Sequence, residues 1–94
     1  MSCRIDRAVD GEDRVVLRVS GRIEAENLDT LREVLRREKH GVVIDLREVV
    51  LVDREVVKFF AFCENNGIAI RNCPAYIREW TDREKARMGM DDQA

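Results

Sequence analysis

The sequence predicts an α/β domain built on a single mixed β-sheet of about four strands, with helices on one face. Short runs of β-branched and apolar residues, clearest at 42–46, are typical of strands inside a sheet that helices cover. Between these runs, apolar residues recur at helical spacing, as at Leu28, Leu31 and Leu35. The elements alternate in the order β-β-α-β-α-β-α. Two right-handed β-α-β crossovers then place the third and fourth strands parallel to their neighbours.

Length and composition limit the classes of function. We expect one domain over the 94 residues, 45% of which are hydrophobic and 38% charged. The 17 Lys and Arg residues against 19 Asp and Glu give a net charge of -2, so the basic excess of a nucleic-acid binder is missing. No apolar run approaches the roughly 20 residues of a membrane span, and the N-terminus lacks the apolar core of a signal peptide. We therefore expect a cytoplasmic protein that binds neither nucleic acid nor membrane.

The first half of the chain is expected to hold two strands and a helix. Weak alternation within 1–10 indicates an edge strand, and the clearer alternation over 15–23 indicates its neighbour. Gly21 interrupts the second strand, which predicts a bulge or a close backbone approach. A helix follows over 24–40. We interpret His40, the single histidine, as a solvated residue near the helix end, since no Ser or Cys nucleophile stands near it in sequence.

The central stretch, 41–57, is where we expect function. An inner strand over 42–46 is followed by a second apolar run, 49–52, which we interpret as a connection. From Asp53 the apolar residues fall at helical spacing, so Asp53 is the expected N-cap of a helix over 53–66. Backbone N–H groups gather at a helix start, and in open sheets ligands and partners dock at the ends of strands.

A last strand and helix complete the prediction. Gly67 is able to take the left-handed conformation that ends the preceding helix, and a strand follows over 68–72. Pro74 suits the first turn of a helix capped by Asn72 or Cys73.

Within this last helix, Tyr76, Ile77 and Trp80 form an apolar face. The capping-box pattern from Thr81 to Glu84 predicts that the helix breaks at Thr81 and restarts. Residues 89–94 are expected to be a frayed tail.

The cysteines and carboxylates do not form a pattern typical of a metal centre or an active site. Cys3, Cys63 and Cys73 lack CxxC spacing, so we interpret them as reduced thiols and predict no metal or other cofactor. Cys63 and Cys73 are expected to pack as small hydrophobic groups, with a redox role for Cys3 as the alternative. Asp45 and Asp53 could act as paired carboxylates, but a strand-end group and a helix cap explain them better. No Gly-rich phosphate loop is present, and we predict no catalytic residue and no enzyme activity.

Several segments together resemble the STAS domain of the anti-sigma factor antagonists. Residues 19–23 match a hydrophobic strand that ends in a Gly-containing turn, and 43–46 match a strand with an Asp at its end. Residues 51–53 match the start of the family's Asp-Ser-Ser-Gly helix opening, and 67–70 resemble its last strand. The resemblance covers about residues 3–85. It implies the same α/β fold and a role in bacterial signalling by protein binding.

The chain departs from the family where the family is regulated. Asp53 is present, but Arg54 and Glu55 replace the two serines, and Val56 replaces the glycine. The resemblance places the phosphorylated serine at Glu55, so this site is non-phosphorylatable. Three interpretations stay open: Glu55 mimics the phosphorylated serine, Arg54 and Glu55 form a charged docking surface for another partner, or both are solvated residues of the first helical turn.

These observations predict a non-catalytic regulatory interaction module that resembles an anti-sigma factor antagonist. The implied partner is a protein such as an anti-sigma factor or a sensor kinase, with a homodimer through the first strand as a further possibility. The predicted partner-binding residues are Asp53, Arg54, Glu55, Val56 and Val57, with Val50 and Phe62 as further interface candidates.

The alternative is a different class of function. A small-ligand sensor domain would hold a nucleotide or a lipid at the helix N-terminus at Asp53. Arg47, Arg54 and Gly21 are the residues that could serve such a site.

Overall fold

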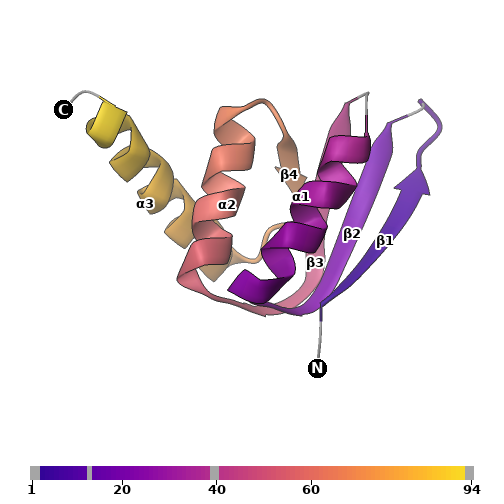
Figure 1. Cartoon of the computed structure of the whole chain (residues 1–94), viewed down its shortest axis with the longest axis horizontal. Coiled ribbons are helices and arrows are strands. Elements are labelled where there is room, and N and C mark those ends of the chain that lie inside the picture. The colour runs from indigo at the N-terminus through magenta and orange to yellow at the C-terminus, as the bar shows by residue number, and fades with distance from the viewer. Residues whose placement is uncertain (1–2, 13, 39–40, 93–94) are drawn as a thin grey trace.

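The computed structural model describes residues 3–12, 14–38 and 41–92. Its elements follow the predicted order, with a short 3₁₀ turn, η1, before the first helix (Figure 1). The bounds are β1 (Arg4–Val9), β2 (Val15–Ile23), η1 (Ala25–Asn27), α1 (Leu28–Arg37), β3 (Val42–Val52), α2 (Arg54–Asn65), β4 (Ala69–Arg71) and α3 (Ala75–Asp92). His40 lies outside the described residues.

The strands form one mixed sheet in the order β1-β2-β3-β4. β1 pairs with β2 antiparallel, whereas β2 with β3 and β3 with β4 are parallel. This arrangement confirms the predicted α/β class, the single mixed sheet and the parallel third and fourth strands. Gly21 has a positive φ of 86°, and the pairing of β2 with β3 shifts register on both sides of it. The interruption predicted at Gly21 is present, but the extra residue at each shift lies in β3 and not in β2.

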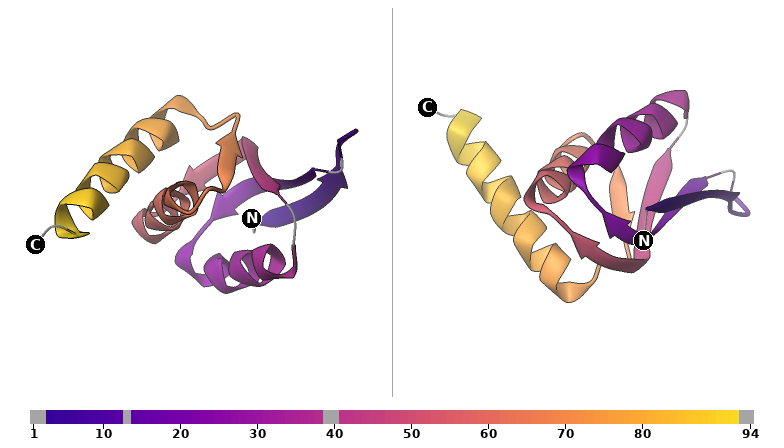
Figure 2. Two further views of the ribbon diagram at one scale, coloured as in Figure 1. Left: turned by 90° about the horizontal axis from the view of Figure 1, so that it is seen from above. Right: turned by 60° about the horizontal axis from the view of Figure 1, so that its bottom comes forward.

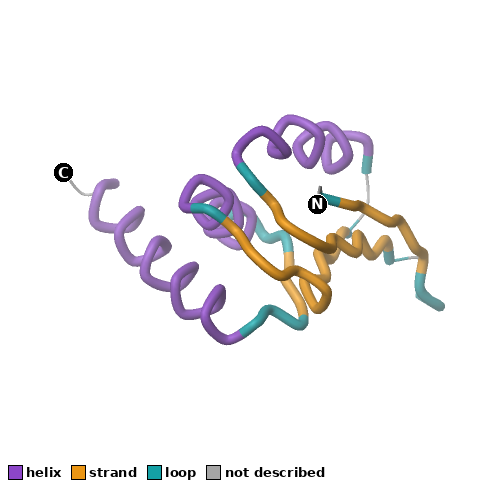
Figure 3. Tube along the Cα trace, turned by 90° about the horizontal axis from the view of Figure 1, so that it is seen from below, coloured by secondary structure: helices purple, strands orange, loops and turns teal. Residues whose placement is uncertain are grey.

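The helices α1 and α2 cover one face of the sheet, and α3 lies beside α2 on the side away from α1 (Figure 2). Alternate residues of β2 and β3, such as Leu17, Val19 and Ile44, face α1 and α2 and are buried. The third helix therefore adds to the helical layer by packing on α2. No helix of the described residues crosses the opposite face of the sheet, as the view from below shows (Figure 3).

The core lies between the sheet and the two covering helices. α2 contributes most to it, because Val56, Val57, Phe60 and Cys63 are almost completely buried. Burial raises the pKa of the Cys63 thiol to about 12, so this side chain is a neutral core group, as predicted. Among the described residues, no helix is both long and apolar enough to cross a lipid bilayer.

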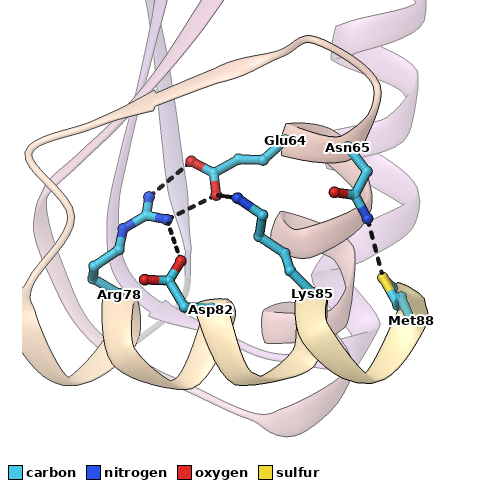
Figure 4. A network of polar contacts seen from close by, with 6 residues as sticks. All are labelled: Glu64, Asn65, Arg78, Asp82, Lys85 and Met88. Atoms are coloured by element: carbon cyan, nitrogen blue, oxygen red, sulfur yellow. Dashed lines mark hydrogen bonds and ion pairs between the residues drawn. The ribbon is translucent and has the colours of Figure 1, made fainter. Parts of the chain in front are cut away.

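A polar network joins the end of α2 to α3 (Figure 4). The Arg78 guanidinium donates two hydrogen bonds to the Glu64 carboxylate, at 2.7 and 2.8 Å. Arg78 also bonds Asp82 at 3.1 Å, and the Lys85 amine lies 3.3 Å from Glu64. The planar fork of arginine matches a carboxylate in two places, so this network fixes the position of α3 along α2.

The prediction that 49–52 is a connection is wrong, because β3 continues without a break to Val52. Gly21 pairs with Val49, and Ile23 pairs with Val52. At each register shift β3 carries one residue more than β2, and these bulges in β3 allow the two strands to stay paired as far as Val52.

The prediction that the last helix breaks at Thr81 is also wrong, because α3 is continuous from Ala75 to Asp92. Thr81 is 1% exposed, and its hydroxyl has no hydrogen-bond partner among the described residues. A capping threonine would turn its hydroxyl to a free backbone N–H, but here packing buries the side chain within a continuous helix. The helix also runs through 89–92, which were expected to fray.

Candidate functional site: the start of α2

Asp53 connects the starts of two helical segments. One carboxylate oxygen accepts the Val56 N–H at 3.0 Å, which makes Asp53 the N-cap of α2, as predicted. The other oxygen accepts the Ala25 N–H of η1 at 2.9 Å. Each bond satisfies a backbone donor that has no partner inside its own helix. Asp53 therefore holds the start of α2 against the end of β2, a contact that the sequence pattern did not indicate.

Arg54, the next residue, is directed toward α3. Its Nε lies 3.9 Å from the Glu84 carboxylate, and the Arg87 guanidinium lies 4.0 Å from the same oxygen. The Glu84 side chain is only 6% exposed and therefore depends on nearby positive charge. Arg54 and Arg87 supply that charge, both at distances longer than a hydrogen bond.

Glu55 is directed to a different neighbour. It is exposed and forms an i,i+3 ion pair with Lys58 at 3.6 Å. It lines a shallow hollow with Arg32 of α1 and with Phe59 and Phe62 of α2. Arg54 and Glu55 therefore lie on different sides of α2, and each has its own charged neighbour.

Val56 and Val57 are both 0% exposed and belong to the core. Their side chains are not available to a partner, so the prediction that they bind one does not hold for them. The helical period explains this, because a helix that lies against a sheet turns adjacent positions of its first turn toward the core.

An exposed apolar surface adjoins the start of α2. We define the β3-end patch as Val50, Leu51 and Tyr76, all of which are exposed. Val50 is 73% exposed, and its carbonyl accepts the Tyr76 hydroxyl at 2.8 Å. The second register shift, between Gly21 and Arg22, leaves the consecutive residues Val50 and Leu51 both exposed.

Sequence reasoning found only part of this surface. Val50 was predicted as an interface residue and is exposed, but the run 49–52 that contains it and Leu51 was expected to be a connection and is the end of β3. Tyr76 was predicted to share an apolar face with Ile77, but Ile77 takes the core position and Tyr76 stays exposed. Phe62 is 55% exposed, as predicted, but it lies on the Glu55 side of α2.

The carboxylates considered for catalysis are occupied. Asp45 accepts the Arg47 backbone N–H at 2.9 Å and the Asn72 side-chain amide at 3.0 Å. Asn72 was predicted as a possible cap of the last helix, but its side chain bonds Asp45, and its backbone adopts a positive φ of 56°. With both Asp45 oxygens and both Asp53 oxygens bonded, the two residues are held as structural groups.

Cys3 and Cys73, the other two cysteines, are partly buried thiols. Burial raises the pKa of the Cys3 and Cys73 thiols, which lowers the reactive thiolate fraction. Cys3 is half-buried and is not part of a disulfide. Within the described part of the chain, no group of three or more His, Cys, Asp or Glu side chains is placed to hold a metal ion.

No protein-family model matches the chain, and a search of curated proteins finds no match.

Proposed function

We propose that this chain is a non-catalytic regulatory module, similar to the STAS domain of the anti-sigma factor antagonists, that binds a protein partner in the cytoplasm. An anti-sigma factor or a sensor kinase is the class of partner that the resemblance implies. The binding surface is the β3-end patch together with Arg54 at the start of α2. The order of elements and the position of Asp53 as N-cap are consistent with the resemblance.

The β3-end patch is the observation that carries the proposal. Three neighbouring apolar side chains are exposed on a chain whose surface is otherwise highly charged. Such patches mark interaction surfaces, because a partner removes their apolar area from water at roughly 25 cal/mol per Å². The Tyr76 hydroxyl is already bonded to Val50, so its ring is held in place and little side-chain entropy is lost on binding.

The module acts without a phosphate switch. Glu55 occupies the position that the resemblance assigns to the phosphorylated serine, and its single charge is fixed and exposed. A carboxylate in the first turn of a helix is stabilised by the helix dipole whether or not a partner is present. Partner binding is therefore constitutive and depends on the amount of each protein in the cell.

A small-ligand site at the start of α2 has less support. The Asp53 carboxylate takes up the Val56 N–H, which a bound phosphate would otherwise need. It also places a negative charge where a nucleotide phosphate or an acidic lipid headgroup would lie.

The test uses purified anti-sigma factors and sensor kinases encoded by the same genome. We expect at least one to bind, and we expect Val50→Glu to weaken that binding at least about tenfold, as for a residue near the centre of an interface. Val9→Glu is the matched control, because Val9 is also an exposed strand valine but lies on β1. Titration calorimetry measures both variants. Binding by no candidate, or equal losses in both variants, would count against the proposal.

The absence of a switch has its own experiment. The double variant Arg54→Ser, Glu55→Ser restores the two serines. Both side chains are exposed, and Arg87 still lies beside Glu84 when Arg54 is removed, so the fold should tolerate the change. We expect the serine kinases of the same cell to phosphorylate residue 55 in this variant, as mass spectrometry would detect, and to leave the start of α2 unmodified in the natural chain. No phosphorylation of the double variant would remove support for descent from the switch.

A further inference from the structure

The face of the sheet opposite α1 and α2 carries a polar hollow of about 470 Å³. We define the open-face hollow by its polar lining residues, which are Arg18, Asp45, Arg47, Glu48, Arg71 and Asn72. They come from β2, β3 and the end of β4. A hollow of this size falls within the range of pockets that hold small molecules.

Strand register brings the arginines together. Arg18 of β2 lies opposite Asp45 of β3, and Asp45 lies opposite Arg71 of β4. Neighbouring strands are about 4.8 Å apart, so Arg18 and Arg71 flank Asp45 at the level of the backbone. Arg47 lines the same hollow, and so does the adjacent Glu48, because the first register shift places an extra residue of β3 between Asp45 and Glu48.

The guanidinium groups of these three arginines lack ion pairs and hydrogen bonds within the described residues. Other arginines of the chain do have such partners: Arg7 bonds Glu38 at 2.8 Å, and Arg78 bonds Glu64. The lining therefore has three arginines against two carboxylates, Asp45 and Glu48, and within the described residues none of the three guanidinium groups is at hydrogen-bond distance from a carboxylate.

Asp45 does not neutralise this charge through direct pairing. Its oxygens are occupied by the Arg47 backbone N–H and the Asn72 amide, both of which are neutral donors. Burial by itself would raise the pKa of Asp45, but these hydrogen bonds and the charges of Arg47 and Arg71 bring the pKa below its ordinary value. Arg47 and Arg71 thus stabilise the negative charge of Asp45, which takes up part of their positive charge.

We propose that the open-face hollow binds a small phosphorylated molecule, with its phosphate held between Arg18, Arg47 and Arg71. Arginine suits this task because its planar fork bonds phosphate oxygens in two places. The carboxylate of Glu48 lines the same hollow, where it repels an extended polyanion and accepts hydrogen bonds from hydroxyl groups. The ligand class is therefore a phosphomonoester that also carries hydroxyl groups, as a sugar phosphate does.

The hollow shares no residue with the β3-end patch, so this proposal stands or fails independently of the proposed partner. It also differs in position from the small-ligand site considered at Asp53, because it lies in the middle of the sheet rather than at a helix N-terminus.

The experiment is an NMR titration of the ¹⁵N-labelled chain with ribose 5-phosphate, inorganic phosphate and ribose, at ionic strength held constant with NaCl. We expect saturable shifts at the amides of Arg18, Arg47 and Arg71, with a Kd on the order of 1 mM or tighter for ribose 5-phosphate. Inorganic phosphate should shift the same amides more weakly, and ribose should leave them unchanged.

Variants locate the binding site. Arg18→Gln and Arg71→Gln should each weaken binding of ribose 5-phosphate about tenfold, the effect of losing charge-assisted hydrogen bonds. Arg22→Gln is the matched control, because Arg22 is also an exposed arginine of β2 without a described ion pair but lies outside the hollow. It should change the Kd less than about twofold, since its charge is screened at that distance. Glu48→Gln should tighten binding of inorganic phosphate by removing a like charge.

Three results would overturn the proposal. One is the lack of saturable shifts up to about 20 mM ribose 5-phosphate, a concentration well above the expected Kd. The second is an equal loss of binding in Arg22→Gln and Arg71→Gln. The third is tighter binding of a DNA oligonucleotide than of ribose 5-phosphate at the same amides, which would replace a small ligand by a polyanion.

Discussion

Charged side chains at the two ends of α2 have specific partners, whereas the arginines of the open-face hollow have none among the described residues. Asp53 at the start of α2 accepts two backbone N–H groups, and Glu64 near its end accepts two bonds from Arg78. Arg18 and Arg71 lie on an exposed strand surface, with water as their available partner.

The difference separates charges that hold the fold from charges that are free to bind. A partly buried carboxylate has lost water and depends on its protein partners, so removal of one partner is costly. An exposed arginine keeps its hydration, and its removal costs the fold little. The first kind of charge should therefore be visible in stability measurements, and the second kind only in binding measurements.

The largest effect is expected at the α2–α3 network. Arg78→Ala leaves the Glu64 carboxylate, which is 15% exposed, without its bidentate partner. We expect a loss of about 2 kcal/mol in the free energy of unfolding, less than for a fully buried pair because Lys85 remains. Urea denaturation measures it. Arg36→Ala is the control, since Arg36 bonds Glu33 at a similar 2.8 Å but both side chains are largely exposed, and it should cost less than about 0.5 kcal/mol. Equal losses would contradict the distinction between the two kinds of charge.

A slightly smaller effect is expected at the other end of α2. Asp53→Ala removes the acceptor for the backbone N–H groups of Val56 and Ala25. The loss should be about 1.5 kcal/mol, in the upper part of the range for a helix cap, because two helical segments are affected. Glu55→Ala, a neighbouring exposed carboxylate, should change stability by less than about 0.5 kcal/mol in the same thermal or urea unfolding experiment. A loss at Glu55 as large as that at Asp53 would show that general helix electrostatics, not capping, is responsible.

The pH dependence of stability should reflect Glu64. The hydrogen bond from Arg78 lowers the pKa of Glu64, with the charges of Arg78 and Lys85 adding to it and burial opposing it. A carboxylate whose pKa is lower in the folded state stabilises the fold above its unfolded-state pKa and loses that contribution as the pH falls through its folded-state pKa. The difference in unfolding free energy between the natural chain and Glu64→Gln should therefore shrink as the pH falls from about 6 to about 3. A difference that stays constant over this range would argue against an ionised Glu64 in the network.

The smallest effect on stability is expected in the open-face hollow. Arg18→Gln and Arg71→Gln should each change the free energy of unfolding by less than about 0.5 kcal/mol, with a gain possible because a repulsion between like charges is relieved. The same urea series that tests Arg78 measures them. A loss above about 1 kcal/mol in either variant would place that arginine among the structural charges.

The fold was predictable where the signal is local. The β-branched run at 42–46 and the alternation at Val15, Leu17 and Val19 each indicate a strand within a few residues, and both lie in the sheet. Asp53 and Gly67 were found for the same reason, because a helix cap depends on the residue type beside the first or last turn.

Prediction failed where a distant segment decides the outcome. The run at 49–52 is a strand only because β2 continues past Gly21 to pair with it. Thr81 follows the pattern of a helix cap, and only its burial within a continuous α3 shows that it is not one. Tyr76 and Ile77 are adjacent, and the packing of α3 determines which of them enters the core.

The candidate sites show the same limit. The sequence marks the start of α2 through a change of period at Asp53, but it does not show that Arg54 and Glu55 have different neighbours. The open-face hollow leaves no continuous motif, because Arg18 and Arg71 meet only through the register of three strands. A different comparison could have found the hollow. If the predicted parallel strands are aligned from their first residues, Arg18, Asp45 and Arg71 fall side by side.

The unequal edges of the sheet constrain how copies of this chain can assemble. β1 offers a free edge of 6 residues, whereas β4 at the other edge has only 3. A short strand exposes few unpaired backbone groups, so it offers little for a strand of another chain to pair with. Two copies joined through β1 about a two-fold axis would use both long edges and leave only the short ones outside. An association of this kind would therefore stop at a symmetric pair and would not continue into a fibre.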